Sequence, residues 1–391
     1  MNSLPAGERL LSGSESVNNR IETKETLFIK HFRDRISFEN ECRMYRMLEN
    51  SGLTPALLDA GECSLTLEYV DGMTLSACLE KGILPDETLA VRLAEWFAAF
   101  ADRTKNTAGE PAVLDDCNPR NFLLCGDRFA GFDFERWQNG TMEETLAAPF
   151  AMIRTMNLEE QRKDTIIRCM LDALKEEVSF DTSSLETAAR ERIREIEERR
   201  TMMKQIRSSA CVILAGGRNS RMNGFPKGLL KTGAYTFMDR ILHTVQVFDR
   251  IFISANTDDY DGFGCPVIRD LIPGHGPLGA LHASLHTITA DPVMLVPCDT
   301  PYLTQRTILR LFQALGPDID AVVARCEGTV YPVIGLYRHR VLDTVTEQLS
   351  GDRYSMRYLL DHVQTVYCDL KDPEEVRNIN TPDELKRFLM L

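Results

Sequence analysis

A glycine-rich segment near the middle of the chain has the residue types that bind nucleotide phosphates. Its sequence, LAGGRNSRMNGFPK at residues 214–227, follows a short apolar run that is typical of a buried strand. The small residues Gly216 and Gly217 would let backbone N–H groups approach phosphate oxygens, and Arg221 and Lys227 could neutralise the phosphate charge. The segment is neither a Walker P-loop nor a GxGxxG fingerprint. An ordinary strand-to-helix turn with solvated charges is the alternative interpretation.

A single carboxylate follows a second buried-strand pattern further along the chain. The apolar run at 293–297 leads into the sequence CDTPY, which puts Asp299 at the carboxyl end of the expected strand. A Mg²⁺ ion that bridges nucleotide phosphates prefers hard oxygen ligands of this kind. A helix N-cap is the alternative role for this aspartate. Residues 269–280 form a loop rich in Gly and Pro, in which His275 by itself indicates no catalyst.

The elements that must position these residues alternate between strand and helix. Apolar runs predict strands at residues 211–214, 250–254, 293–297, 321–324 and 333–337, and helical patterns follow at 237–247, 278–287 and 304–315. Such alternation predicts a mostly parallel sheet with helices on both faces. In such sheets ligands bind beyond the carboxyl ends of the strands, where the glycine-rich and polar sequences occur.

Together these segments resemble the molybdenum cofactor guanylyltransferases, the MobA family of nucleotidyltransferases, over about residues 208–391. The matching pieces are Leu214-Ala215-Gly216-Gly217 with Arg221, Met222 and Lys227, Asp270 before Gly276-Pro277-Leu278-Gly279, Cys298-Asp299-Thr300-Pro301, Tyr331-Pro332-Val333, and Asn378-Ile379-Asn380-Thr381-Pro382. Ala-Gly-Gly after the first strand and the Gly-Pro-Leu-Gly loop favour the guanylyl branch over cytidylyl relatives. Two departures concern the substrate side: residues 222–226 lack a Gly directly after Met, and Tyr331 replaces a frequent His.

The resemblance implies transfer of GMP from GTP to the terminal phosphate of molybdenum-loaded molybdopterin, with Mg²⁺ as cofactor and pyrophosphate as product. The implied site residues are Leu214, Ala215, Gly216 and Gly217 for the nucleotide, Arg221 and Lys227 for its phosphates, Asn256 and Asp270 for guanosine, Asp299 for Mg²⁺, and Asn378 and Asn380 for the side that receives the pterin. The attacking phosphate is already an anion, so the reaction needs positive charge and in-line placement rather than a general base.

Residue spacing in the first half of the chain indicates a phosphotransfer site. Lys30 lies in a strand pattern, and Glu41 lies in the amphipathic helix pattern that follows. Asp116 is followed by Asn121 five positions on and by Asp133 twelve positions beyond that. In this spacing the first aspartate can orient a substrate hydroxyl while the other two residues hold Mg²⁺. Taken singly, each acid could equally be a solvated loop carboxylate.

The order of these residues resembles the aminoglycoside, choline and lipopolysaccharide-sugar kinases over about residues 8–180. The resemblance implies ATP as cofactor, with Lys30 and Glu41 at the ATP phosphates, Asp116 as the catalytic aspartate, and Asn121 and Asp133 as metal ligands. Leu114 stands where the family has His, residues 13–16 are poor in glycine, and Glu135 takes the Gly position after Asp133-Phe134. The resemblance names no substrate.

Length and charge divide the chain into two domains. Its 391 residues exceed what one core usually supports, and residues 1–200 carry a net charge of −12 against −1 for the remainder. We expect an N-terminal α+β protein-kinase-like domain at 1–182, a charged connecting helix at 183–207, and a C-terminal α/β Rossmann-like nucleotidyltransferase domain at 208–391. The helix either packs on the first domain or stands free as a linker.

Composition excludes several classes of protein. Neither half has the basic excess of a nucleic-acid binder, and no apolar run is long enough to span a membrane. The 11 cysteines include no CxxC pair, which argues against structural zinc and fits a reducing cytoplasm.

Three other functions stay open at this point. The same fold could use CTP on molybdopterin, or a kinase and a nucleotidyltransferase could act in sequence on a sugar or alcohol. The first half could also be a binding module for an apo-molybdoenzyme that receives the cofactor.

Overall fold

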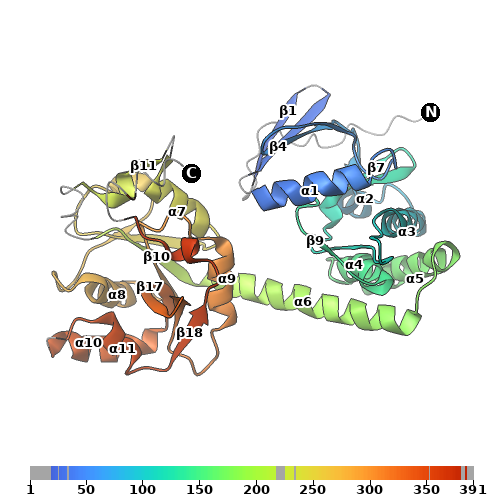
Figure 1. The fold of residues 1–391 in the computed structure, drawn as a ribbon. Coiled ribbons are helices and arrows are strands. Elements are labelled where there is room, and N and C mark those ends of the chain that lie inside the picture. Colours follow the sequence, from blue (N-terminus) through green and yellow to red (C-terminus); the bar gives the residue numbers. More distant parts are fainter. Residues whose placement is uncertain are drawn as a thin grey trace. The chain divides into compact units, whose positions relative to one another are not determined.

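The computed structural model describes residues 19–24, 26–32, 35–216, 225–232, 235–351, 353–379 and 384. It divides into two units, Met1–Glu198 and Arg199–Leu391, drawn in Figure 1. Within the described ranges, none of the helices combines the length and the apolar character that crossing a membrane requires.

The C-terminal unit is built on a seven-stranded sheet with the order β14-β13-β10-β15-β17-β16-β18. Its strands are β10 (Ala210–Leu214), β13 (Arg250–Ser254), β14 (Val267–Ile268), β15 (Val293–Pro297), β16 (Ala321–Cys326), β17 (Thr329–Tyr337) and β18 (Thr365–Asp369). The pairs β14–β13, β13–β10, β10–β15 and β16–β18 are parallel, whereas β17 is antiparallel to both neighbours. The sheet is therefore mixed and mostly parallel, as the alternation of strands and helices predicted.

Helices cover both faces of this sheet, and the alternation of side chains along β10 shows how. Cys211 and Ile213 pack with the core on the face of α7 and α9, while Ala210 and Val212 pack with α8, α10 and α11 on the other. A strand buried on both faces reads as a continuous apolar run, which is why β10 and β15 were predictable. The helices are α7 (Phe237–Val245), α8 (Gly276–Thr287), α9 (Gln305–Gln313), α10 (Leu342–Ser350) and α11 (Met356–Leu360).

The remaining C-terminal elements are short and lie around this sheet. A two-stranded hairpin pairs β11 (Lys231–Thr232) with β12 (Tyr235–Thr236). The 3₁₀ turns are η3 (Lys227–Leu229), η4 (Asp261–Phe263), η5 (His339–Val341) and η6 (Pro373–Val376). Two of these turns matter for the site, because η3 begins with Lys227 and η6 precedes Asn378.

The N-terminal unit is an α+β arrangement of three small antiparallel sheets and a helical part (Figure 1). A four-stranded sheet has the order β1-β2-β4-β3, a three-stranded sheet the order β5-β7-β8, and β6 pairs with β9. The strands are β1 (Asn19–Lys24), β2 (Leu27–Phe32), β3 (Leu57–Ala60), β4 (Ser64–Glu68), β5 (Met73–Thr74), β6 (Ala112–Leu114), β7 (Phe122–Cys125), β8 (Arg128–Gly131) and β9 (Trp137–Asn139). The helices are α1 (Arg35–Met47), α2 (Leu75–Lys81), α3 (Asp86–Arg103), α4 (Met142–Arg154) and α5 (Glu160–Glu177), with a 3₁₀ turn η1 (Pro119–Asn121).

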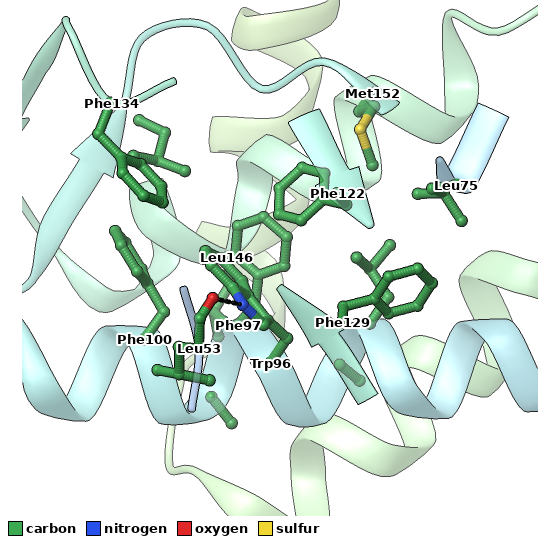
Figure 2. Close-up of a cluster of buried hydrophobic side chains, with 14 of the residues drawn as sticks. Leu53, Leu75, Trp96, Phe97, Phe100, Phe122, Phe129, Phe134, Leu146 and Met152 are labelled. Atoms are coloured by element: carbon green, nitrogen blue, oxygen red, sulfur yellow. Dashed lines mark hydrogen bonds between the residues drawn. The ribbon is translucent and has the colours of Figure 1, made fainter. Parts of the chain in front are cut away.

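An aromatic cluster on α3 forms the centre of the N-terminal core (Figure 2). Trp96 stacks on Phe100 at 4.9 Å between ring centroids and meets Phe122 edge-on at 5.0 Å. Its indole N–H donates to the backbone carbonyl of Leu53 at 2.8 Å, so the one polar atom of this side chain is satisfied inside the core. The cluster ties α3 to β7 and to the loop before β3.

The charged segment near the middle of the chain forms one long helix, α6 (Thr182–Ser208). Leu185 near its start is buried in the N-terminal core, with Ala188 and Ala189 packed against it. Ile206 near its end is buried in the C-terminal core. The two ends of α6 therefore belong to different cores. The helix is neither packed only on the first domain nor a free linker.

Candidate active site

Four adjacent parallel strands of the C-terminal sheet end at one edge, and a residue singled out from the sequence follows each. Asp270 comes after β14, Asn256 after β13, Ala215 directly after β10, and Asp299 after β15. Because the carboxyl ends of parallel strands meet at the same edge, these residues lie close together. The topology therefore assembles residues that are up to 84 positions apart in the sequence.

A cavity of about 610 Å³ opens at this edge. It is lined by Leu214, Ala215, Gly216, Pro226, Ser254, Asn256, Thr257, Asp259, Tyr260, Asp270, Gly274, Gly276, Pro277 and Ala280. Its volume is in the range of pockets that hold small organic ligands. Five residues expected at the nucleotide, namely Leu214, Ala215, Gly216, Asn256 and Asp270, line this one cavity.

Asn256 and Asp270 hold each other in place on the cavity wall. The Asn256 side-chain amide donates to Oδ2 of Asp270 at 2.8 Å, and the Asp270 backbone N–H donates to the Asn256 side-chain oxygen at 2.9 Å. The amide uses both of its ends in this pair, so its orientation is fixed by the two bonds. The carboxylate keeps its second oxygen for a further donor, which suits recognition of N–H groups on a ligand.

Lys227 and Asp299 form an ion pair, with 2.9 Å between Nζ and Oδ2. Their side chains are 20% and 13% exposed, so both remain accessible to a ligand. Backbone hydrogen bonds place them beside the cavity: the Cys298 N–H donates to the Leu214 carbonyl at 3.1 Å, and the Ile379 N–H donates to the Asp299 carbonyl at 2.9 Å. A cation and a carboxylate thus lie next to the segment that follows β10.

The bond from Ile379 also brings the preceding residue, Asn378, next to the Asp299 backbone. Three other residues expected at this site, Gly217, Arg221 and Asn380, lie outside the residues that the structure describes. His275 is the N-cap residue of α8, and its ring packs edge-on against Tyr354 with 4.2 Å between centroids. His275 thus has a structural contact, in keeping with the reading that it indicates no catalyst by itself.

Two buried groups next to the ion pair are held in their neutral forms. Burial, with the Asp299 charge adding to it, raises the pKa of the Cys298 thiol to about 12. Burial also raises the pKa of Tyr260, whose ring lies against the η3 turn that begins with Lys227. At neutral pH a thiol and a phenol of this kind are neither nucleophiles nor bases. Neither Cys298 nor Tyr260 therefore adds a charge beside the Lys227–Asp299 pair at neutral pH.

The N-terminal unit brings together Lys30, Glu41 and Asp133, which the resemblance to kinases had grouped. The Lys30 ammonium is 2.7 Å from Glu41, 2.5 Å from Asp133 and 2.8 Å from Glu135. Each of these three acids offers one carboxylate oxygen, and the three oxygens lie within 4.8 Å of one another. A lysine ammonium has three N–H donors, so three carboxylates can satisfy all of them.

Burial sets the protonation of this cluster. Lys30 and Glu41 are 5% and 1% exposed. Burial disfavours the charged amine, but the nearby carboxylates outweigh it and raise the pKa of Lys30 above its ordinary value. Burial raises the pKa of Glu41 to about 7, although Lys30 opposes this shift. Lys30 therefore stays charged at neutral pH, whereas Glu41 is close to its midpoint.

The other two residues expected in the N-terminal site lie on neighbouring loops. Asn121 ends the η1 turn, and its carbonyl accepts from the Phe132 N–H at 3.0 Å, which places it beside the segment that holds Asp133. Asp116 is exposed and makes no hydrogen bond or ion pair with any residue in the described part of the chain. The structure thus brings Asn121 next to the cluster and leaves Asp116 open to solvent.

Sequence reasoning missed two residues of these sites. Glu135 stood out only as a departure from a pattern, yet it pairs with Lys30 across 105 positions of sequence. Tyr260 lines the C-terminal cavity and is 1% exposed, but no motif or periodicity distinguishes it. Its position four residues after Asn256 on the loop that follows β13 is the one signal that could have pointed to it.

Comparison with known proteins assigns the C-terminal unit. Residues 211–366 match the family model of the MobA-like NTP transferase domain. Molybdenum cofactor guanylyltransferase from Vibrio cholerae is 37% identical over 183 residues, which are 45% of this chain and 89% of that protein. The enzyme of the same name from Vibrio parahaemolyticus is 36% identical over 191 residues, or 48% of this chain and 97% of that protein.

A solved structure is also similar to this unit. It is the molybdopterin-guanine dinucleotide biosynthesis protein A from Archaeoglobus fulgidus, with 19% identity, a TM-score of 0.41, and coverage of 46% of this chain and 95% of that one. The family match lies outside the N-terminal unit, whose fold remains unidentified. Through its C-terminal unit, the chain belongs to the MobA family of molybdenum cofactor guanylyltransferases and is a nucleotidyltransferase of that type.

Proposed function

We propose that the C-terminal unit transfers GMP from GTP to molybdenum-loaded molybdopterin and releases pyrophosphate. The observation that supports this most strongly is the Lys227–Asp299 pair, which lies beside a cavity lined by the segment Leu214–Ala215–Gly216. Exposed backbone at the end of a strand, a cation and a partly exposed carboxylate form a set that suits a nucleoside triphosphate.

In the proposed reaction a phosphate oxygen of molybdopterin attacks the α-phosphorus of GTP. The bond from that phosphorus to the bridging oxygen of the β-phosphate breaks, and pyrophosphate leaves with the electron pair. The nucleophile is already an anion, so the protein has to place it in line and balance the charge. Lys227 supplies positive charge when its ammonium turns from Asp299 toward the phosphates, and we propose the same role for Arg221.

Asp299 fits a magnesium ion as well. Mg²⁺ is commonly held by one or two carboxylates together with substrate phosphates, and the Asp299 carboxylate is accessible beside the phosphate-binding segment. A magnesium ion held there would offset the negative charge on the triphosphate.

Asn256 and Asp270 account for selection of the base. The guanine edge offers a ring N–H and an amino group side by side, and the Asp270 carboxylate, fixed by Asn256, has an oxygen free to accept from them. Gly216 and Gly217 would bind the nucleotide through their backbone. We place molybdopterin on the side of Asn378 and Asn380, and we expect an apo-molybdoenzyme as the recipient of the finished cofactor.

The test is pyrophosphate release by the full chain with molybdenum-loaded molybdopterin and Mg²⁺, with GTP and CTP in parallel. Release that depends on both GTP and the acceptor supports the proposal. Release with CTP alone would retain the chemistry and change the product to the cytosine dinucleotide. If neither nucleotide gives pyrophosphate release, the result would contradict a molybdopterin acceptor. It would favour a fused kinase and nucleotidyltransferase that act on a sugar or alcohol.

We further propose a kinase-like phosphotransfer site in the N-terminal unit, because the structure joins the buried Lys30 and Glu41 to the half-exposed Asp133 in one cluster. ATP would bind with a phosphate at Lys30, and Asp133 and Asn121 would hold its Mg²⁺. Asp116, exposed on a neighbouring loop, would orient the substrate hydroxyl. On this view residues 1–182 and 208–391 are separate catalytic domains joined by the helix at 183–207.

A narrow apolar cavity supports the nucleotide part of this second proposal. Phe28, Leu67, Tyr69, Leu123 and Phe132 are among its lining residues. Phe28 lies two positions before Lys30 on β2, so the two side chains point to the same face of the sheet. An apolar slot beside a phosphate-binding lysine suits the flat base of a nucleotide.

Binding of MgATP to the full chain, measured by calorimetry, tests the second proposal. Asp133→Asn keeps the Lys30–Glu41 pair, so it is expected to weaken MgATP binding without unfolding the unit. Lys227→Gln changes the other domain and serves as the matched control. Equal loss in both variants, or no MgATP binding by the wild-type chain, would contradict an ATP site at Lys30.

A further inference from the structure

A polar cavity of about 320 Å³ in the N-terminal unit has no part in either proposed reaction. Its lining includes Asn40, Asp115, Arg136, Trp137, Gln138 and Arg192, and we call it the arginine cavity. These residues come from α1, from the ends of β6 and β9, and from α6.

Hydrogen bonds to the backbone hold the walls of the arginine cavity in place. The Asp115 N–H donates to the Arg136 carbonyl at 3.1 Å, next to the pairing of β6 with β9. The Trp137 indole N–H donates to the Asn40 carbonyl at 3.1 Å. Arg192 on α6 donates to the carbonyl of the last residue of β6 at 2.8 Å. These bonds fix the backbone that carries Arg136, and the bond from Arg192 also fixes the guanidinium group of Arg192 itself.

The two arginines face one carboxylate without hydrogen bonding to it. Asp115 lies 3.6 Å from Arg136 and 3.7 Å from Arg192, beyond the range of a normal hydrogen bond. Its side chain is 49% exposed, so it can turn into solvent. Arg192 also contacts Glu195 at 3.3 Å, and Arg43 lies over the Trp137 ring at 5.2 Å.

The charge around the arginine cavity is therefore opposite to that of the unit. The lining of the cavity carries two guanidinium groups against one carboxylate, whereas residues 1–200 together carry −12. A guanidinium group is a planar fork of five N–H donors that suits the oxygens of a phosphate. Arg192 uses three of its donors on the carbonyls of Leu114 and Asp115 and on Glu195, which leaves part of its fork for an anion. The acidic surroundings make a local excess of positive charge selective for an anion that fits the cavity.

We infer that the arginine cavity binds a small phosphate-bearing anion. Arg136 and Arg192 donate to its oxygens in the place of Asp115, whose carboxylate swings out to solvent. The volume admits a phosphate on a small organic group as well as inorganic phosphate itself. Asn40 and Arg136 adjoin Glu41 and Glu135 in the sequence, and the Asn40 side-chain amide donates to the Glu135 carbonyl at 3.1 Å, so occupancy would alter the Lys30 cluster. That last effect rests on the proposed ATP site, whereas anion binding does not.

The test is calorimetric titration of the full chain with inorganic phosphate and, separately, with pyrophosphate. Arg136→Gln removes one of the two cations and is expected to weaken binding by about tenfold or more. Asp115→Asn removes the competing carboxylate and is expected to tighten binding severalfold. Arg128→Gln changes an exposed arginine of the same unit, 3.8 Å from Asp127, and is the matched control that should bind as the wild type does.

A binding site predicts that the two substitutions change the phosphate affinity in opposite directions, whereas a purely structural ion pair does not. Weakening by Arg136→Gln together with tightening by Asp115→Asn supports the inference. Equal affinity in all four proteins would show that phosphate binds elsewhere and would overturn it, as would the lack of any phosphate or pyrophosphate binding by the wild type at millimolar concentration. If Arg136→Gln does not fold, the Asp115→Asn titration decides alone, and unchanged or weaker binding there overturns the inference.

Discussion

A single methyl group added at Gly228 tests how Lys227, which we propose contacts the phosphates, is positioned. A Cβ on Gly228 would lie 2.8 Å from Cε1 and 3.1 Å from the hydroxyl oxygen of Tyr260, and 3.4 Å from Cε of Met238. The shortest of these distances is about 0.6 Å below that of an ordinary carbon contact. Tyr260 is 1% exposed and packed in the core, so its ring cannot retreat.

The strain of Gly228→Ala therefore falls on the η3 turn, whose first residue is Lys227. Overpacking of this kind costs about 1–3 kcal/mol of stability when the backbone stays in place. If the turn moves instead, the Lys227 ammonium moves with it, and misplacement by about 1 Å can reduce a rate by about 10²-fold. We expect most of the effect in kcat for acceptor-dependent pyrophosphate release, with the KM for GTP changed much less.

Two further variants make this prediction specific. Gly262→Ala is the matched control, because a Cβ there meets no atom within 4 Å. Tyr260→Leu, added to Gly228→Ala, removes the ring atoms that clash and is expected to restore part of the rate. A Gly228→Ala enzyme with wild-type kcat, or a double variant slower than both single variants, would refute the reasoning that the Tyr260 ring sets the position of Lys227.

Three other predictions follow. Asp299→Ala is expected to lower GMP transfer by about 10²–10³-fold while near-UV circular dichroism stays unchanged, because it removes an electrostatic contact at a strand end and little of the core. Gly131→Ala would put a Cβ 2.5 Å from the Trp96 ring, so the midpoint of denaturant unfolding followed by tryptophan fluorescence should fall. Burial raises the pKa of Glu41 to about 7 in the folded state. At a pH between the ordinary pKa of glutamate and about 7, the folded state therefore holds a proton that the unfolded state has released. The stability due to this proton is present below the ordinary pKa and is lost as the pH rises through about 7, a dependence that Glu41→Gln should abolish.

Each of these has an outcome that contradicts it. Transfer at a near wild-type rate would remove Asp299 from the site. An unchanged unfolding midpoint for Gly131→Ala would show that the aromatic side chains can shift to accommodate the added methyl group. Tryptophan fluorescence reports on the N-terminal unit alone, since Trp96 and Trp137 both lie there. Equal pH profiles of unfolding for the wild type and Glu41→Gln would therefore contradict a raised pKa at this position.

Strands β10 and β15 were predictable because they are buried on both faces, and their continuous apolar runs located β15 to the residue and β10 to within one residue. Strand β13 was also located to the residue, although it begins with an exposed arginine and only its last two residues are buried. The edge strands were missed for the opposite reason: β14 has two residues, and β18 is half-buried with a mixed pattern. The antiparallel direction of β17 could not be predicted either, because strand direction depends on tertiary pairing that local periodicity does not encode.

The motifs and the family resemblances indicated which residues would gather, but not how they pair. Residues at strand ends, such as Asn256 and Asp270, were expected near the nucleotide, and the structure places both on one cavity wall. Their mutual hydrogen bonds and the direct Lys227–Asp299 contact depend on side-chain positions that no motif specifies. The third partner of Lys30, Glu135, was unexpected because that contact depends on the path of the chain after Asp133.

The most direct test of the central claim is identification of the product. The wild-type chain and Asp299→Ala are incubated with molybdenum-loaded molybdopterin, GTP and Mg²⁺, and the released cofactor is analysed by mass spectrometry. The account predicts molybdopterin joined to GMP, formed by the wild type and greatly reduced in the variant. Molybdopterin that remains unmodified while the wild type is folded and supplied with GTP would contradict it.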